Sequence, residues 1–174
     1  DAGGVYVEGS YELLMADDIR WGNLNKEGVA VDPESRRNLL FVKQAYMRLA
    51  QSLLNRGQND SAVAVLDRCL EFFPDEKVPY DFYMLAYPEI YYKAGAVEKG
   101  DELIDVIINN CLDNLRYYNE LNEKFVPYYA ETIRENLAMI NEMSNIAARN
   151  NRVELKQRLE NLLDQEFNRF MYLF

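Results

Sequence analysis

Apolar residues recur every three or four positions along most of the chain, which predicts amphipathic α-helices rather than strands. The clearest case is a helix over residues 33 to 55. Asp32 followed by Pro33 predicts its start, with the aspartate as N-cap, and Gly57 is placed to end it. Its apolar positions form one wide face, made of Leu39, Leu40, Val42, Tyr46, Leu49, Ala50, Leu53 and Leu54.

A second helix is predicted to follow at once, capped by Asn59 or Asp60 and closed by Pro74. Its apolar positions are Ala62, Val63, Val65, Leu66, Cys69, Leu70 and Phe73. Taken together, the two helices have the residue spacing of a tetratricopeptide repeat. The positions that match are Tyr46, Leu49, Ala50, Leu53 and Gly57, then Ala62, Leu66, Cys69 and Pro74.

A second, longer copy is predicted after the first. Gly95 would end its first helix as Gly57 does in the first copy, 38 residues earlier, whereas the usual period is about 34. The extra residues fit in a connector around Val78 and Pro79. Pro88 falls where the first copy has Ala50, so we expect it to kink this helix.

The remaining segments predict a short lead-in and a final pair of helices. Ser10 could cap a short N-terminal helix, and two helices over about 126–149 and 152–172 would form an antiparallel hairpin with its turn at Asn150 and Asn151. We therefore predict an all-α fold of tetratricopeptide-like helical hairpin repeats. It comprises a lead-in with a short helix over 1–32 and a single repeat domain over 33–174. Within that domain we place repeat one at about 43–76, repeat two at about 81–114, and a C-terminal capping hairpin at about 123–174.

Composition and charge narrow the function classes. The chain has 174 residues with 49% hydrophobic and 28% charged residues, as ordinary globular domains do. A net charge of −10 without a basic cluster argues against nucleic acid as a partner. No apolar run reaches the roughly 18 residues of a membrane span. Histidine is absent, which removes the commonest general base and metal ligand. No nucleophile–base pair, calcium loop or phosphate loop is present, so we predict no catalytic residues, no metal site and no cofactor.

The register of the repeats suggests a binding groove, because the first helix of each repeat lines the concave face. The predicted groove residues are Gln44, Met47, Gln51, Asn55, Phe82, Glu89, Tyr92 and Lys93. Amides beside aromatic rings suit a peptide or a sugar. The alternative is that two repeats make too shallow a groove and that the last helices cover it.

Three other features have both a functional and a structural interpretation. Thirteen tyrosines include the pairs Tyr91-Tyr92, Tyr117-Tyr118 and Tyr128-Tyr129, which could contact carbohydrate or protein or simply pack between helices. The acidic stripe between Glu98 and Asp105 is interpreted as a solvated helix face. Cys69 and Cys111 are interpreted as buried small side chains, although a disulfide between neighbouring helices is also compatible with the sequence.

The chain also resembles the C-terminal region of a domain-of-unknown-function family of bacterial multi-spanning membrane proteins, over about residues 20 to 120. The residues that carry this resemblance are Arg20-Trp21-Gly22-Asn23, Val31-Asp32, Arg37, Arg48-Leu49-Ala50, Ser61-Ala62-Val63-Ala64-Val65-Leu66-Asp67-Arg68-Cys69, Lys77-Val78-Pro79-Tyr80-Asp81, Tyr91-Tyr92-Lys93-Ala94-Gly95 and Tyr117-Tyr118. That family is related to GT-C glycosyltransferases and is often labelled protein O-mannosyltransferase-like.

The resemblance implies a membrane-embedded catalytic half, placed before residue 1, that uses a lipid-linked sugar. The chain itself would then be a non-catalytic accessory module on the periplasmic side, binding a protein or peptide partner and attached to the membrane through the preceding part. The alternative is a carbohydrate-binding accessory domain that uses exposed tyrosines. Neither the partner nor a glycan specificity follows from the sequence.

Overall fold

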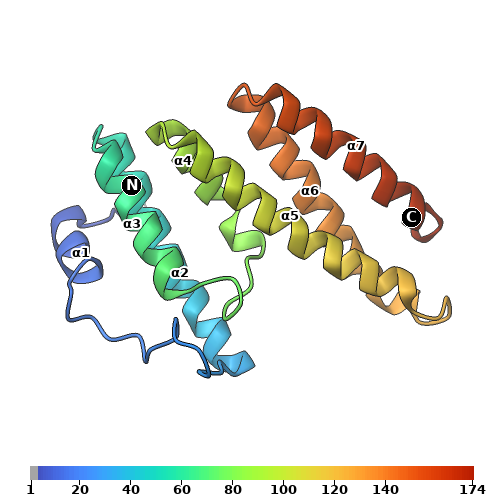
Figure 1. Ribbon diagram of the computed structural model, residues 1–174, viewed down its shortest axis with the longest axis horizontal. Coiled ribbons are helices and arrows are strands. Elements are labelled where there is room, and N and C mark those ends of the chain that lie inside the picture. Colours follow the sequence, from blue (N-terminus) through green and yellow to red (C-terminus); the bar gives the residue numbers. More distant parts are fainter. Residues whose placement is uncertain (1–3) are drawn as a thin grey trace. The chain divides into compact units, whose positions relative to one another are not determined.

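The computed structural model describes residues 4–174, and this part of the chain is all-helical, without a strand (Figure 1). It divides into two compact units, Asp1–Gly100 and Asp101–Phe174. The elements are α1 (Val7–Leu14), α2 (Pro33–Asn55), α3 (Asn59–Phe72), η1 (Phe82–Met84), α4 (Ala86–Ala94), α5 (Val97–Glu120), η2 (Val126–Tyr129), α6 (Ala130–Arg149), α7 (Val153–Phe170) and η3 (Met171–Leu173), where η denotes a 3-10 helix. None of the described helices combines the length and the apolar character that a membrane span requires.

Helices α2 and α3 form the central hairpin of the first unit, and α4 packs against both of them (Figure 1). The residues that carry the repeat spacing are buried in this hairpin. Tyr46, Leu49, Ala50, Leu53, Ala62, Leu66 and Cys69 are all nearly inaccessible to solvent. Burying a large aliphatic side chain contributes roughly 1.5–3 kcal/mol, so this face dominates the stability of the hairpin.

The predicted start and end of α2 are confirmed. One Asp32 carboxylate oxygen accepts hydrogen bonds from the backbone N–H groups of Glu34 and Ser35, each at 3.0 Å. Gly57 has a φ of +72°, which a glycine adopts without steric cost. The predicted caps of α3 are wrong, because α3 begins at Asn59, directly after the turn. Gln58 is its N-cap, and no side chain makes the capping hydrogen bond.

The kink predicted at Pro88 does not occur, because Pro88 lies in the first turn of α4 rather than in its middle. Asp81 caps the separate 3-10 helix η1 through the backbone N–H of Tyr83, at 3.0 Å. The α-helix then begins at Ala86. A proline has no N–H to donate to the carbonyl four residues earlier, which here belongs to Met84, so η1 and α4 stay separate.

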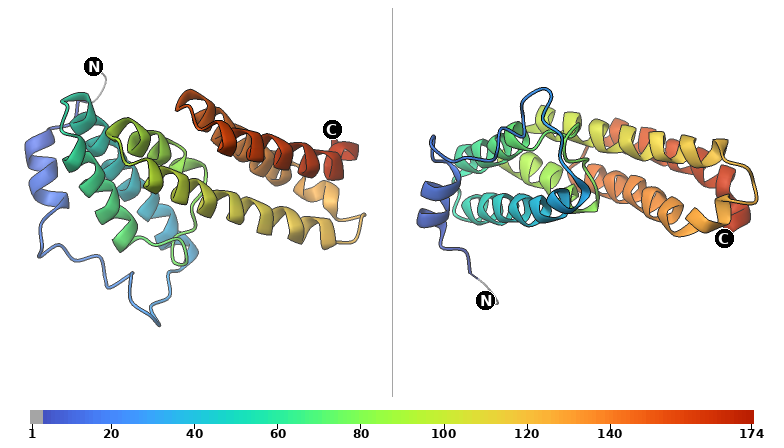
Figure 2. Two further views of the ribbon diagram at one scale, coloured as in Figure 1. Left: turned by 45° about the horizontal axis from the view of Figure 1, so that its top comes forward. Right: turned by 90° about the horizontal axis from the view of Figure 1, so that it is seen from below.

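The N-terminal segment packs on the first unit. Helix α1 starts at Val7, so Ser10 lies inside it and does not cap it. The long connection to α2 runs beside the α2–α3 hairpin (Figure 2). Its tryptophan, Trp21, packs edge-on against the buried ring of Phe73, with 5.3 Å between ring centroids. Tyr46 donates a hydrogen bond from its hydroxyl to the carbonyl of Leu14 at 2.9 Å.

In the second unit α6 and α7 form the expected hairpin, and they run side by side in both views of Figure 2. The turn at Asn150–Asn151 is confirmed, with Asn151 in the left-handed region at a φ of +59°. The acidic stripe of α5 is not merely a solvated face. Asp101 pairs with Arg152, and Asp105 pairs with Arg158, which joins α5 to α7 and the turn before it.

Candidate functional site

The α2 part of the predicted groove is accessible. Gln44, Met47 and Gln51 are partly exposed, and Asn55 is exposed. Gln51 donates from Nε2 to the side-chain oxygen of Asn55 at 3.0 Å, one turn further along the helix. These four side chains therefore form one continuous polar stripe with a methionine in it, on the side of α2 away from the buried face.

The segment predicted as the second repeat contributes less to this surface than its sequence predicts. Glu89 and Lys93 pair with each other along α4, at 2.9 Å between Oε1 and Nζ. Phe82 is 67% exposed but lies in η1 rather than on the α-helix. Tyr92 is only 8% exposed, because its ring packs against Gly100 at the start of α5 and so offers little surface to a ligand.

Helix α2 also carries a buried lysine, Lys43, which the sequence did not predict to be buried. Lys43 is 1% exposed, and its Nζ donates to the carbonyl of Val78 at 2.9 Å and lies 4.5 Å from the ring centroid of Tyr80. Burial lowers the pKa of Lys43 to about 8, although Cys69, Asp81 and Asp75 oppose this change. Its helical position could have indicated this burial, because Lys43 lies three residues before Tyr46 on the apolar face.

This lysine explains the Lys77–Asp81 connector, to which the sequence alone assigned no role. Val78 supplies the acceptor for Lys43, and Tyr80 supplies the aromatic face. The backbone N–H of Tyr80 donates to Asp75 at 2.6 Å. Lys77 donates from Nζ to the carbonyl of Val29 at 3.0 Å. The connector therefore covers the buried amine of Lys43.

The Tyr87 hydroxyl and the Cys69 thiol are buried close to the backbone of Lys43. The Tyr87 hydroxyl donates to the carbonyl of Lys43 at 2.7 Å and lies 3.3 Å from the Cys69 sulfur. Burial raises the pKa of the Cys69 thiol to about 12, and it does the same for Cys111. Both cysteines are free and buried, so the disulfide that the sequence left open is not formed.

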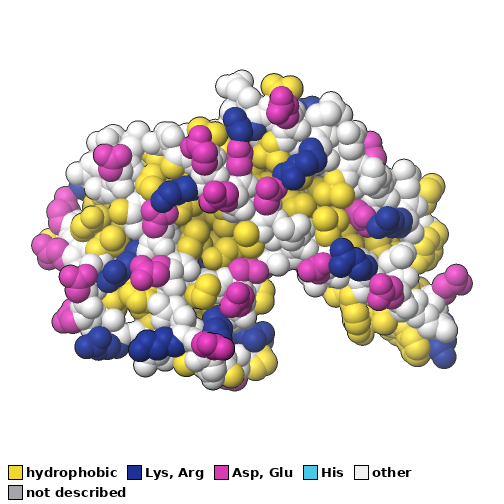
Figure 3. Space-filling view, in the orientation of Figure 1, with side chains coloured by type: hydrophobic (Ala, Val, Ile, Leu, Met, Phe, Trp, Pro, Cys, Tyr) yellow, Lys and Arg dark blue, Asp and Glu magenta, His cyan; other side chains and the backbone are white. Residues whose placement is uncertain are grey.

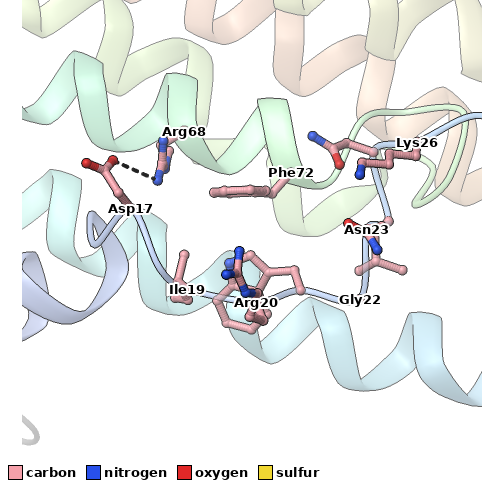
Figure 4. Close-up of a pocket in the computed structure, with 11 residues that line it drawn as sticks. Asp17, Ile19, Arg20, Gly22, Asn23, Lys26, Arg68 and Phe72 are labelled. Atoms are coloured by element: carbon pink, nitrogen blue, oxygen red, sulfur yellow. Dashed lines mark ion pairs between the residues drawn. The ribbon is translucent and has the colours of Figure 1, made fainter.

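A cavity of about 500 Å³ lies between the loop after α1 and helix α3. Figure 4 shows residues of the loop facing Arg68 and Phe72 of α3. The Arg68 guanidinium lies 4.7 Å from the Phe72 ring centroid and donates from Nη2 to the carbonyl of Ala16 at 3.1 Å. The full lining is Asp17, Ile19, Arg20, Trp21, Gly22, Asn23, Leu24, Asn25, Lys26, Arg68 and Phe72.

Exposed tyrosines gather at one end of the second unit, where α5 ends and η2 begins. The rings of Tyr118 and Tyr129 are stacked with 5.0 Å between centroids, and Tyr117 meets Tyr118 edge-on at 5.4 Å. Tyr128 is 82% exposed, and Phe125 beside it is also exposed. We call Tyr117, Tyr118, Phe125, Tyr128 and Tyr129 the tyrosine cluster. Figure 3 shows hydrophobic side chains at the lower right, where α5 ends.

Within residues 4–174, no three Asp, Glu or Cys side chains come close enough to hold a metal ion. Comparison of the chain with known proteins gave no matching family model, no matching curated protein and no matching solved structure.

Proposed function

We propose that the first unit is a tetratricopeptide-like, non-catalytic module that binds a protein or peptide. Its contact surface would be the stripe of Gln44, Met47, Gln51 and Asn55, extended by Glu89 and Lys93. In the parent that the sequence resemblance implies, this module would serve a membrane glycosyltransferase-like protein on the periplasmic side, recruiting or orienting an acceptor protein.

One observation carries this proposal, namely the contrast between the two sides of α2. The side that carries the repeat spacing is buried against α3 and α4, as in stacked helical hairpins. The other side of α2 presents three amides and a methionine to solvent, from Gln44, Met47, Gln51 and Asn55. Methionine and amide side chains adapt to a partner's shape and hydrogen-bonding groups, which suits a peptide-binding surface.

Site-specific photocrosslinking in the full-length parent protein tests the stripe. A photoreactive residue at Met47 or Gln51 should give discrete adducts that an excess of the isolated first unit competes away. Gln51→Ala combined with Gln44→Ala should reduce adduct formation from position 47. A photoreactive residue at Glu71, exposed on α3, is the matched control. Equal adducts from position 71, or adducts unaffected by the double variant, would contradict the proposal.

The tyrosine cluster favours a second candidate function, carbohydrate binding by the second unit. The stacked pair Tyr118 and Tyr129, with exposed Tyr117 and Tyr128 beside it, offers ring faces on which a sugar could stack while the hydroxyls remain available for hydrogen bonds. Asn122 lies in the loop between α5 and η2, three residues before Phe125 of the tyrosine cluster.

A titration with sugars followed by NMR of the tyrosine ring protons tests this candidate. Binding should perturb Tyr117, Tyr128 and Tyr129 and should be lost in Tyr128→Ala. Tyr6, 73% exposed in the first unit, is the control ring and should not shift. An absence of shifts at millimolar sugar would exclude the tyrosine cluster as a glycan site.

A further inference from the structure

The cavity beside Arg68 carries positive charge in an otherwise acidic chain. Three cationic side chains line it, from Arg20, Lys26 and Arg68, against the single carboxylate of Asp17. The lining thus has an excess of two positive charges, whereas the whole chain has a net charge of −10. A local reversal of this kind concentrates anions at the cavity.

Arg68 has the features of an anchor for an oxygen-rich ligand. Its guanidinium is held in place by the Phe72 ring and by the carbonyl of Ala16. Its Nε is shielded from solvent and has no hydrogen-bond acceptor among the described residues. The fully exposed carboxylate of Asp17 lies 3.6 Å from Nη2, too far for a strong hydrogen bond. A planar guanidinium with unused donor capacity is suited to phosphate oxygens.

The rest of the cavity is too large and too apolar for a bare ion. Its volume of about 500 Å³ falls in the range of sites for small organic molecules. Phe72 and Trp21 contribute ring surface, while Ile19 and Leu24 contribute aliphatic surface. The side-chain amides of Asn23 and Asn25 complete the lining. The ligand should therefore combine a doubly charged group with an apolar or ring-shaped substituent.

We propose that this cavity binds an organic phosphate monoester, which carries nearly two negative charges at neutral pH. Arg68 and Arg20 contact the phosphate oxygens, Lys26 adds charge, and the substituent packs on Phe72 and Trp21. The site is separate from the stripe on α2, so either proposal can fail without the other.

Trp21 is the only tryptophan of the chain and lines the cavity, so its fluorescence reports on the site. The test titrates the protein with phenyl phosphate at constant ionic strength, with inorganic phosphate, benzoate and benzyl alcohol as comparison probes. We expect a saturable change with phenyl phosphate below about 10 mM, with each comparison probe binding more weakly. Phenyl phosphate that gives no saturable change, or that binds no more tightly than a comparison probe, overturns the proposal.

Substitutions at three exposed positions test the proposal further and leave the core intact. Arg20→Gln should weaken phenyl phosphate binding about tenfold or more, because it removes a charged donor. Asp17→Asn should tighten binding a few fold, since it removes a like charge from the rim. Arg36→Gln, an exposed arginine of α2 outside the cavity lining, should leave the affinity unchanged. Unchanged affinity in Arg20→Gln, or an equal loss in Arg36→Gln, overturns the proposal.

Discussion

Replacing Lys43 with methionine should change how the stability of the first unit depends on pH. The pKa of Lys43 falls from an ordinary 10.5 to about 8 because the side chain is buried. Between these values the unfolded chain binds more protons at this position than the folded chain does. The free energy of unfolding of the wild type therefore gains a contribution as pH rises from about 8 to 10.5. The methionine variant lacks this contribution.

The size of the effect follows from the same pKa. A fall from 10.5 to about 8 corresponds to roughly 3 kcal/mol. Near neutral pH this penalty destabilises the wild type almost in full, and the methionine variant is free of it. The variant instead loses about 1–3 kcal/mol, because methionine leaves the Val78 carbonyl without its donor. The two proteins should then be similarly stable near pH 7. By about pH 10 the wild type should have gained roughly 2–3 kcal/mol over the variant.

Urea denaturation followed by Trp21 fluorescence measures this difference, because Trp21 packs on Phe73 in the core of the first unit. Comparing the two proteins at each pH cancels the contribution of groups that both contain, including the thiols. Lys93→Met, at an exposed lysine paired with Glu89, is the control and should show a difference that varies by less than about 0.5 kcal/mol. If the difference between wild type and Lys43→Met is independent of pH from 7 to 10, the account of Lys43 as a buried, shifted amine is wrong.

Three further predictions concern Gly100, Asp32 and the two cysteines. Gly100→Ala should destabilise the first unit by about 1–3 kcal/mol in urea denaturation, because the new Cβ would lie 2.6 Å from Cε1 of Tyr92; unchanged stability would show that the ring moves without cost. Asp32→Ala should lower the melting temperature by a few degrees through loss of the α2 cap. Asp32→Asn should lower it much less, because the amide oxygen can still accept from the backbone. Equal losses in the two variants would refute the capping role. Cys69 and Cys111 should react with iodoacetamide more than about tenfold more slowly in the folded protein than in urea, as mass spectrometry can follow, and fast labelling of either thiol would contradict its burial.

Local signals in the sequence predicted the helices well. Asp32 with Pro33 marks the start of α2 because a capping carboxylate and a proline act within one turn. Gly57 and Gly95 both adopt positive φ where helices end, as their spacing predicted. These features depend on a few neighbouring residues, so no tertiary information was needed.

Features that depend on distant residues were not predictable in the same way. Whether Pro88 kinks a helix or lies at its start depends on where the helix begins, and that is determined by the separate turn that Asp81 caps. The burial of Lys43 depends on a connector 35 residues later in the chain. The Arg68 cavity depends on a loop about 50 residues earlier, whose Trp-Gly-Asn sequence has no helical periodicity to interpret.

The packing of the N-terminal segment also sets the smallest piece of the chain that can fold as the first unit. A chain shortened to begin at the α2 cap would lose the ring that Trp21 places on Phe73 and the carbonyl of Leu14 that accepts from Tyr46. It would also leave Arg68 without the carbonyl of Ala16, and Lys77 without that of Val29. The boundary of the folding unit therefore lies before α1, which starts at Val7, whereas the repeat pattern alone would start the unit at about residue 43.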